Sequence, residues 1–312
     1  MARLTRSNSC LSLLFAAALL LWGSPVQAGN PGEAGFLSLR FPVGAREAGM
    51  GDAGVAASQG AAAVFWNPAN NIFHEFDTTL ILQHYRYVGA MSQEAAALAH
   101  KVGDGVLGLI FMGFYSDEIP RRSAEPVGID EGFFKPYDVA FGLSYAHPLG
   151  DSFALGMNAK LVYERIDFYS DTGMAYDFFM SHKALIEGMM FGASLTNVGK
   201  QKNLYDGPFD LPTAYKFGYA YTPNDLFLQE NVTFAGDIFI PKDTSAKVHV
   251  GCEYRVVPEL TLRVGSKINY DLYGLTAGFG VALKNFNLDY AYQDMIVDGF
   301  EVGHKFALNM VW

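Results

Sequence analysis

The sequence predicts an all-β protein, a transmembrane antiparallel β-barrel of about fourteen strands. From about residue 77 onward, apolar residues alternate with polar or small residues at a period of two. In several segments the alternation lasts about ten residues or more, the length that a tilted strand needs to cross a bilayer, whereas strands of soluble sandwiches are commonly about 5–6 residues long. A closed barrel is the β architecture that leaves no backbone group unpaired in lipid.

Aromatic residues near the ends of many segments support a membrane barrel, because such barrels carry aromatic girdles at both interfaces. The tyrosines that we expect in these girdles are Tyr85 and Tyr87, Tyr137 and Tyr145, Tyr219 and Tyr221, and Tyr290 and Tyr292.

The first 28 residues are typical of a secretory signal peptide. Arg3 and Arg6 form a charged start, and an apolar core follows from Leu11 to Leu21. Ala28 supplies the small residue that a signal peptidase needs. The apolar run is too short for a spanning helix, which needs roughly 18 apolar residues or more. We therefore expect cleavage near Ala28 and, together with the barrel, a place in the bacterial outer membrane.

Composition and charge exclude several classes of function. Without the signal peptide the chain keeps 20 basic and 32 acidic residues, a net charge of −12, and an acidic protein does not suit nucleic acid. Cys252 would be the only cysteine left, so no internal disulfide is expected. The seven histidines show no metal-ligand spacing, and no G-x-S-x-G motif is present. We expect no metal, no cofactor and no enzyme activity.

The alternation places fourteen strands, and an even number returns both chain ends to the periplasm. In that topology the odd-numbered connections face outward, and the three longest connections (117–135, 198–212 and 294–302) are odd-numbered. The expected strands are residues 77–88, 92–101, 105–116, 136–147, 152–166, 172–183, 187–197, 213–222, 231–240, 246–256, 259–269, 273–284, 286–293 and 303–312.

The last strand ends on an aromatic residue and carries its apolar residues on one face. This arrangement is similar to the C-terminal signal that barrel-assembly machinery recognises in outer-membrane proteins. We therefore expect this machinery and outer-membrane lipid as partners. The residues of the expected signal are Phe306, Leu308, Met310 and Trp312.

The stretch from Gly49 to Gly54 reads G-x-G-x-x-G, the pattern that holds a dinucleotide pyrophosphate. That reading needs a strand just before the first glycine and a helix on the last. No such strand precedes Gly49. The surrounding residues are rich in Ala and Gly and poor in charge, which suits close packing inside another structure.

The same stretch resembles the N-terminal signature of PorV/PorQ-type proteins, which belong to the FadL-like group of fourteen-stranded outer-membrane barrels. The resemblance extends through 192–199, 211–221, 259–267 and 273–281, so it covers nearly the whole chain after the signal peptide. It implies that residues 29–76 fold into the lumen as a hatch and that 77–312 form the barrel. The hatch motif comprises Gly44, Arg46, Gly49, Gly51, Gly54, Trp66, Asn67 and Pro68.

Charged residues on the polar face of the strands are expected to line the lumen. Arg46 is the only cation between Arg40 and the first strand, and we expect it either to pair with a lumen carboxylate (Glu164, Glu253 or Asp237) or to lie solvated at the periplasmic rim. We expect the other charges to be paired or hydrated. The expected lumen residues are Asn158, Lys160, Glu164, Asp237, His249, Glu253, Arg255 and Arg263.

Three functions remain open from the sequence. The FadL-like resemblance implies passage of hydrophobic small molecules across the outer membrane. The PorV/PorQ resemblance implies a component of a type IX-like secretion system that binds exported cargo and hands it over at the cell surface. The third is a structural barrel that anchors partner proteins.

Overall fold

The computed structural model describes residues 34–87, 91–121, 132–201, 210–224, 231–295 and 303–312. The predicted signal peptide, its cleavage near Ala28 and the first residues of the predicted hatch lie outside the described residues.

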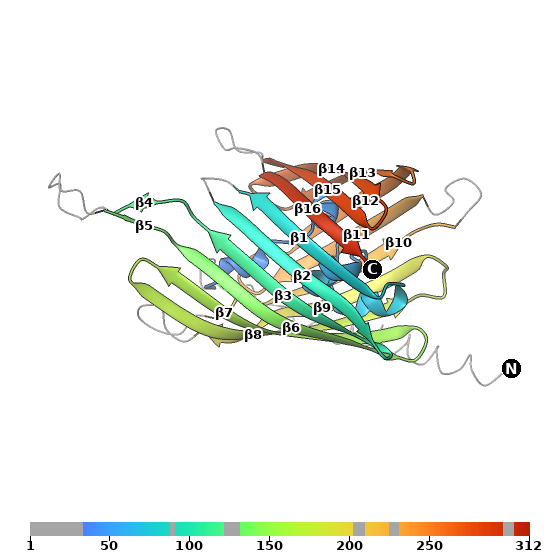
Figure 1. Cartoon of the computed structure of the whole chain (residues 1–312), viewed down its shortest axis with the longest axis horizontal. Helices are drawn as coiled ribbons and strands as arrows, with labels where there is room; N and C mark the ends of the chain where they lie inside the picture. Colours follow the sequence, from blue (N-terminus) through green and yellow to red (C-terminus); the bar gives the residue numbers. More distant parts are fainter. Residues whose placement is uncertain (1–33, 88–90, 122–131, 202–209, 225–230, 296–302) are drawn as a thin grey trace.

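Fourteen antiparallel strands form a closed barrel (Figure 1), and β1 closes it by pairing with β16. The order around the barrel is β1-β16-β15-β14-β13-β12-β11-β10-β9-β8-β7-β6-β3-β2. The barrel strands are β1 Thr78–Arg86, β2 Ser92–Val102, β3 Gly105–Tyr115, β6 Tyr137–Leu149, β7 Phe153–Ile166, β8 Tyr169–Lys183, β9 Met189–Gln201, β10 Ala214–Tyr221, β11 Val232–Pro241, β12 Lys247–Val257, β13 Leu260–Ile268, β14 Tyr273–Leu283, β15 Phe286–Met295 and β16 Gly303–Val311. The predicted fold class and strand number are confirmed.

Two strand bounds differ from the prediction by three residues or more, each for a local reason. β8 begins at Tyr169, because β7 and β8 are joined by Asp167 and Phe168 alone, with Asp167 at a φ of 54°. β9 continues to Gln201 through a register shift opposite Tyr176 and Phe178, and Asn197 adopts a φ of 59° there. Such a bulge interrupts the period of two, so the alternation ends before the strand does.

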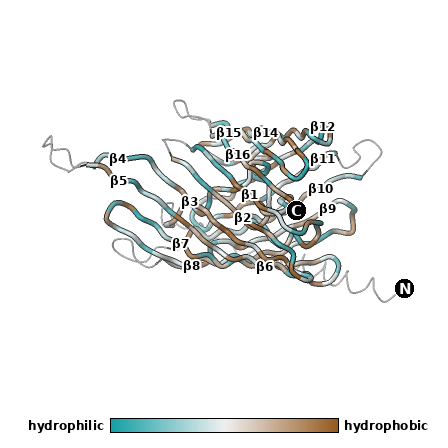
Figure 2. Tube along the Cα trace, viewed as in Figure 1, coloured by the Kyte–Doolittle hydropathy of each residue, from teal (hydrophilic) through white to brown (hydrophobic). Residues whose placement is uncertain are grey.

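Apolar side chains face outward and small or polar side chains face inward. Figure 2 shows hydrophobic and hydrophilic residues alternating along the strands. On β6, Phe141 and Leu143 are 56% and 65% exposed, while Ala140 and Ser144 are buried. Two girdle assignments are wrong, since Tyr85 is buried inside the barrel, where it donates to Gln293, and Tyr87 on the same face packs against Phe41 of the chain inside the barrel, with ring centroids 4.8 Å apart. Among the described residues, no helix is long and apolar enough to span a membrane.

The connection between β3 and β6 carries a two-stranded arm, β4 Ile119–Pro120 and β5 Phe133–Phe134. The arm projects beyond the barrel at the left of Figure 1. Arg121 donates to Asp167 in the β7–β8 turn and lies 4.6 Å from the ring centroid of Phe168. These contacts hold the arm, just beyond β4, against the β7–β8 turn.

Residues 34–76, which we call the luminal segment, lie inside the barrel (blue in Figure 1). We call the barrel end with Thr78 and Trp312 the periplasmic end, following the predicted topology, and the opposite end the outer end. The segment begins near the outer end, where Gly35 donates to Asp210, and it ends at β1. Its helices are η1 Leu37–Arg40, α2 Ala45–Gly49, α3 Gly60–Trp66 and η2 Pro68–Phe73.

Candidate functional site: the luminal segment and its seat in the barrel wall

Two pairs of wall glycines let the backbone of the luminal segment touch the barrel. Gly251 and Gly265 are paired across β12 and β13. A Cβ on Gly251 would lie 2.3 Å from the Met50 carbonyl oxygen, and one on Gly265 would lie 2.2 Å from the Gly51 nitrogen. These distances leave no room for any side chain at either position, so the glycines form a seat for the segment.

The second pair, Gly192 and Gly218, joins β9 and β10 beneath Val55. A Cβ on Gly192 would lie 2.5 Å from the Val55 carbonyl oxygen. On the first seat, Gly51 itself adopts a φ of 69°, a conformation that favours glycine. The G-x-G-x-x-G stretch is thus a tight turn against the wall.

Wall side chains satisfy the backbone groups of this turn. Asp237 Oδ2 accepts from the nitrogens of Gly54 (2.8 Å) and Val55 (2.9 Å). Thr276 Oγ1 accepts from the Gly51 nitrogen (2.9 Å) and donates to the Gly49 carbonyl (3.1 Å). Because buried backbone groups need hydrogen-bond partners, these contacts hold the turn at one height in the barrel.

The Trp66-Asn67-Pro68 motif ties distant parts of the luminal segment together. Trp66 Nε1 donates to the Val43 carbonyl (2.6 Å), and the indole packs so closely on Gly54 that a Cβ there would lie 2.5 Å from it. Asn67 Nδ2 donates to the carbonyls of Val55 (3.1 Å) and of Met180 in β8 (3.0 Å). Pro68 is the first residue of η2, a position at which the backbone N–H has no partner within the helix, so proline loses no hydrogen bond there.

Arg46 joins the segment to an ion network in the wall. Its Nε and Nη2 donate to the two carboxylate oxygens of Glu253, each at 2.9 Å, and its Nη1 donates to the Ala57 carbonyl (2.7 Å). Glu253 is one of the three carboxylates expected as its partner. The Arg46 side chain is 18% exposed, so it is not solvated at the rim.

The network continues through a second arginine. Arg263 donates through Nε to Glu253 and through Nη1 to Asp289, both at 2.6 Å. Asp289 also accepts from Asn287 and Asn309, each at 2.8 Å. The two arginines and two carboxylates therefore balance in charge, and the bidentate geometry is the one in which Arg binds carboxylate best.

A second group of charges holds the segment nearer the outer end. Asp52 forms an ion pair with Lys267, and Lys305 Nζ donates to the Pro42 carbonyl (2.7 Å). His249 bridges the Asp52 carbonyl (3.0 Å) and the Tyr270 hydroxyl (2.8 Å).

The remaining predicted lumen residues have separate places. Asn158 donates to the Val64 carbonyl (2.9 Å), and Lys160 pairs with Asp177 (2.8 Å), so both lie in the lumen opposite the arginine network. Glu164 lies nearer the outer end, opposite Asp138. Arg255 is exposed near the periplasmic end of β12 and is not part of the ion network. The predicted C-terminal signal lies on β16, where Trp312 is 57% exposed and its backbone pairs with Thr78.

The lumen has an apolar side as well as the charged one. Around β2, β3, β6, β7 and β8, buried apolar residues of the wall pack against the luminal segment. A cavity of about 50 Å³ lies there, between residues 39–43 and α3. Its lining is mixed: Asn158, the Lys160–Asp177 ion pair, Arg40 and Lys216 border it together with the apolar residues Leu39, Phe41, Phe65, Ile110, Met112 and Ala140.

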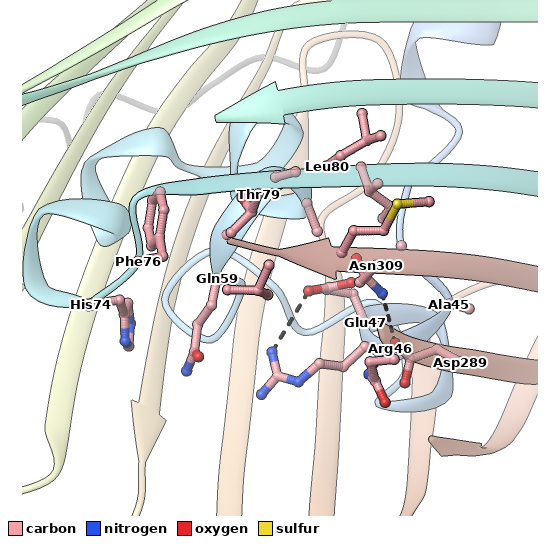
Figure 3. Close-up of a pocket in the computed structure, with 18 of the residues that line it drawn as sticks. Ala45, Arg46, Glu47, Gln59, His74, Phe76, Thr79, Leu80, Asp289 and Asn309 are labelled. Carbon is pink, nitrogen blue, oxygen red and sulfur yellow. Dashed lines mark hydrogen bonds and ion pairs between the residues drawn. The ribbon is translucent and has the colours of Figure 1, made fainter. Parts of the chain in front are cut away.

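A larger cavity, of about 240 Å³, lies at the periplasmic end between α2, the start of α3, residues 74–76 and strands β1, β15 and β16. Figure 3 shows Arg46, Glu47, Gln59 and His74 around it. Burial lowers the pKa of His74 to about 4, so its ring is neutral at pH 7. Glu47 is 1% exposed; Ser58 donates to its Oε1 (2.8 Å), whereas its Oε2 has no hydrogen-bond partner among the described residues.

Burial raises the pKa of Glu47 above its usual range. A carboxyl whose folded pKa is raised contributes stability that is complete below its usual pKa and is lost as the pH rises through the raised value. We therefore expect the order of the luminal segment to fall with rising pH and Glu47→Gln to flatten this dependence. Hydrogen exchange of residues 45–57, measured over a pH series and corrected for intrinsic rates, checks it. Glu75→Gln, an exposed neighbour of the same cavity, is the control, and equal slopes for the Glu47→Gln variant and the unaltered protein would contradict it.

The wall glycines are the part of this site that the sequence reasoning missed. Their signal is present in the sequence: Gly192, Gly218, Gly251 and Gly265 occupy inward positions in strands that otherwise alternate regularly. A glycine inside a strand often marks a place where another backbone approaches closely. Among the described residues, no group of three or more His, Cys, Asp or Glu side chains could hold a metal.

Solved structures with the same architecture identify the fold. The toluene transporter TbuX of Ralstonia pickettii aligns with a TM-score of 0.65 and 14% identity, over 86% of this chain and 98% of that chain. The monoaromatic hydrocarbon channel CymD aligns with a TM-score of 0.62 and 12% identity, over 86% and 97%. A Pseudomonas aeruginosa FadL homologue aligns with a TM-score of 0.59 and 12% identity, over 87% and 99%.

The fold is that of the FadL-like outer-membrane barrels. No family model and no curated protein matches the chain, so the likeness lies in the architecture. The likeness is one of fold, a closed barrel of fourteen antiparallel strands.

Proposed function

We propose that this FadL-like barrel moves hydrophobic small molecules across the outer membrane. The observation that carries the proposal is a lumen with two chemically different sides, both occupied by the luminal segment. On the side of β11 to β16 the segment is held by ions and hydrogen bonds. On the side of β2 to β8 no ion pair joins it to the wall among the described residues. There it packs against apolar side chains near the 50 Å³ cavity and is held by neutral hydrogen bonds, such as those from Asn158 to the Val64 carbonyl and from Asn67 to the Met180 carbonyl.

The two sides of the lumen therefore hold the luminal segment in different ways. The ion network fixes one edge of the segment, because removing either partner from a buried ion pair is costly. The other edge makes apolar contacts, which are not directional, and neutral hydrogen bonds, so it can separate from the wall without leaving charges unpaired. An apolar solute would pass along this edge, entering from the outer end and leaving sideways or toward the periplasm when the segment shifts. The apolar ligands named for TbuX, CymD and TodX are of the size that such a narrow route suits.

Ala140→Phe tests this route, because Ala140 is buried at the 50 Å³ cavity and a ring there fills it. We expect uptake of labelled toluene by cells with an intact outer membrane to rise when the protein is expressed and to return to the empty-vector rate with Ala140→Phe. Ala159→Phe, on the lipid-facing side of β7, is the matched control. If cells that express the unaltered protein take up toluene no faster than cells with the empty vector, the proposal is wrong.

The finer PorV/PorQ assignment rests on the motif residues and offers a second candidate function. In that case the outer surface would receive exported proteins as part of a type IX-like secretion system. The β4–β5 arm and the β7–β8 turn that it contacts favour it, because Phe133 on the arm and Phe168 in the turn are 54% and 77% exposed. Stable co-purification of a translocon or of cargo, lost when the arm is deleted, would favour this function, and co-purified apolar ligand without partner proteins would count against it.

A further inference from the structure

A histidine and a glutamate form a hydrogen-bonded pair on the lipid-facing surface of the barrel. His84 on β1 and Glu94 on β2 are cross-strand neighbours, and His84 Nδ1 lies 2.6 Å from Glu94 Oε1. Both side chains point outward, with exposures of 52% and 42%. Placing an ionisable group on a lipid-facing surface costs more free energy near the middle of the bilayer than near its interfaces. We therefore expect polar groups, of the protein or of the lipid, next to this pair.

The rows of paired residues place it just inside the outer interface. One row farther out, Arg86 pairs in register with His304 of β16 and with Ser92 of β2. That row continues through tyrosines on both sides, namely Tyr292, Tyr115 and Tyr137. Such a row of tyrosines is typical of an interfacial girdle. His84 and Glu94 therefore lie at the boundary between headgroups and hydrocarbon.

Below the pair, a groove of about 410 Å³ runs over β15, β16, β1 and β2 toward the middle of the barrel. Apart from His84 and Glu94 at its polar end, its outward-facing side chains are apolar. Ala96 forms a low floor between larger walls, which are Leu82, Phe111, Leu288, Phe306 and Leu308.

We propose that this surface binds a phosphorylated glycolipid of the outer leaflet. Arg86 is exposed and makes no ion pair with any described residue, and His304 uses Nδ1 with the Tyr290 hydroxyl (2.9 Å), which leaves Nε2 for a ligand. A guanidinium and an imidazole in register suit a phosphate. The Glu94 carboxylate can accept hydrogen bonds from sugar hydroxyls or amides, which a simple phospholipid headgroup offers less well. An acyl chain fills the groove below.

The site is independent of the lumen and of the proposed transport, because all its residues lie on the outer face of the wall. Its loss would leave uptake through the lumen unchanged, and a failure of the uptake experiment would leave this site untouched. Direct binding to the purified full-length protein is therefore the test.

The probes are deep-rough lipopolysaccharide and the same lipid after enzymatic removal of its phosphates. We expect native mass spectrometry to show binding of the phosphorylated form, weakened about tenfold or more by the double variant Arg86→Gln/His304→Gln, which corresponds to about 1.4 kcal/mol. Arg165→Gln is the matched control, since Arg165 is an exposed arginine whose Nε donates to the Asp167 carbonyl (3.2 Å) away from the groove.

A second pair of variants tests the groove. Ala96→Phe should reduce binding by filling the floor, whereas Ala159→Phe, which lines a neighbouring apolar depression but not this groove, should not. A heat-modifiable gel shift shows that each variant forms the barrel. Equal binding of the dephosphorylated lipid, unchanged binding by both groups of variants, or a protein bound at this surface in place of lipid would each overturn the proposal.

Discussion

Replacement of Arg46 by Ala should detach the luminal segment from the β12–β13 wall. The substitution removes both charge-assisted hydrogen bonds to Glu253 and the bond to the Ala57 carbonyl. Breaking a buried pair costs about 3–5 kcal/mol, and the 18% exposure of Arg46 places it near the lower value. A loss of about 3 kcal/mol raises the opening equilibrium of the segment roughly 100-fold. Hydrogen exchange of residues 45–57 should accelerate by that factor, while the barrel strands stay protected.

Two further variants distinguish loss of the Arg46–Glu253 ion pair from a general loss of stability. Arg46→Lys keeps the charge but loses the bidentate geometry, so its effect should be intermediate. Glu253→Ala should cost more than Arg46→Ala, because it leaves two guanidiniums without the carboxylate that they share. Arg255→Ala, two residues along the same strand and exposed, is the control. If residues 45–57 exchange hydrogen at the same rate in the Arg46→Ala and Arg255→Ala variants, the ion network does not hold the segment.

The barrel could be predicted from the sequence because the two faces of each strand lie in different environments. Lipid outside and a packed lumen inside impose a period of two over the full length of a strand, as Phe141 and Leu143 alternate with Ala140 and Ser144. The prediction is least accurate where the backbone departs from this period, at the bulge near Asn197 and at the two-residue turn that begins with Asp167. Tyr85 shows a second limit, since an aromatic residue near a strand end suits either face.

The site could be predicted only in part, because its partners are far apart in the chain. Charge and strand parity suggested a lumen carboxylate such as Glu164, Glu253 or Asp237 as the partner of Arg46, and left open that Arg46 is solvated. Glu253 is the partner that it contacts. The choice among them depends on the height at which the luminal segment lies in the barrel. That height is set by backbone contacts of Met50 and Gly51 with wall glycines, which no pattern of charge reveals.

The height at which the segment lies can be tested with a single methyl group. Gly265→Ala places a Cβ only 2.2 Å from the Gly51 nitrogen, and backbone atoms cannot move aside as a flexible side chain does. Overpacking usually costs about 1–3 kcal/mol and occasionally more. Here the whole turn must leave the wall, which also breaks the bonds of Gly51 to Thr276 and of Gly54 to Asp237. We therefore expect an effect at least as large as that of Arg46→Ala.

The barrel itself should tolerate Gly265→Ala, because a β-strand accepts alanine and the clash involves only the luminal segment. Planar-bilayer recordings should then show an ion conductance that the unaltered protein lacks, and heat modifiability should remain. Gly236→Ala is the matched control: it adds the same methyl group to a barrel strand, but there the Cβ meets the movable side chain of Tyr219. If Gly265→Ala recordings match those of Gly236→Ala, the segment does not seal the lumen through its contact with this wall, and the barrier to ions must lie elsewhere along the lumen.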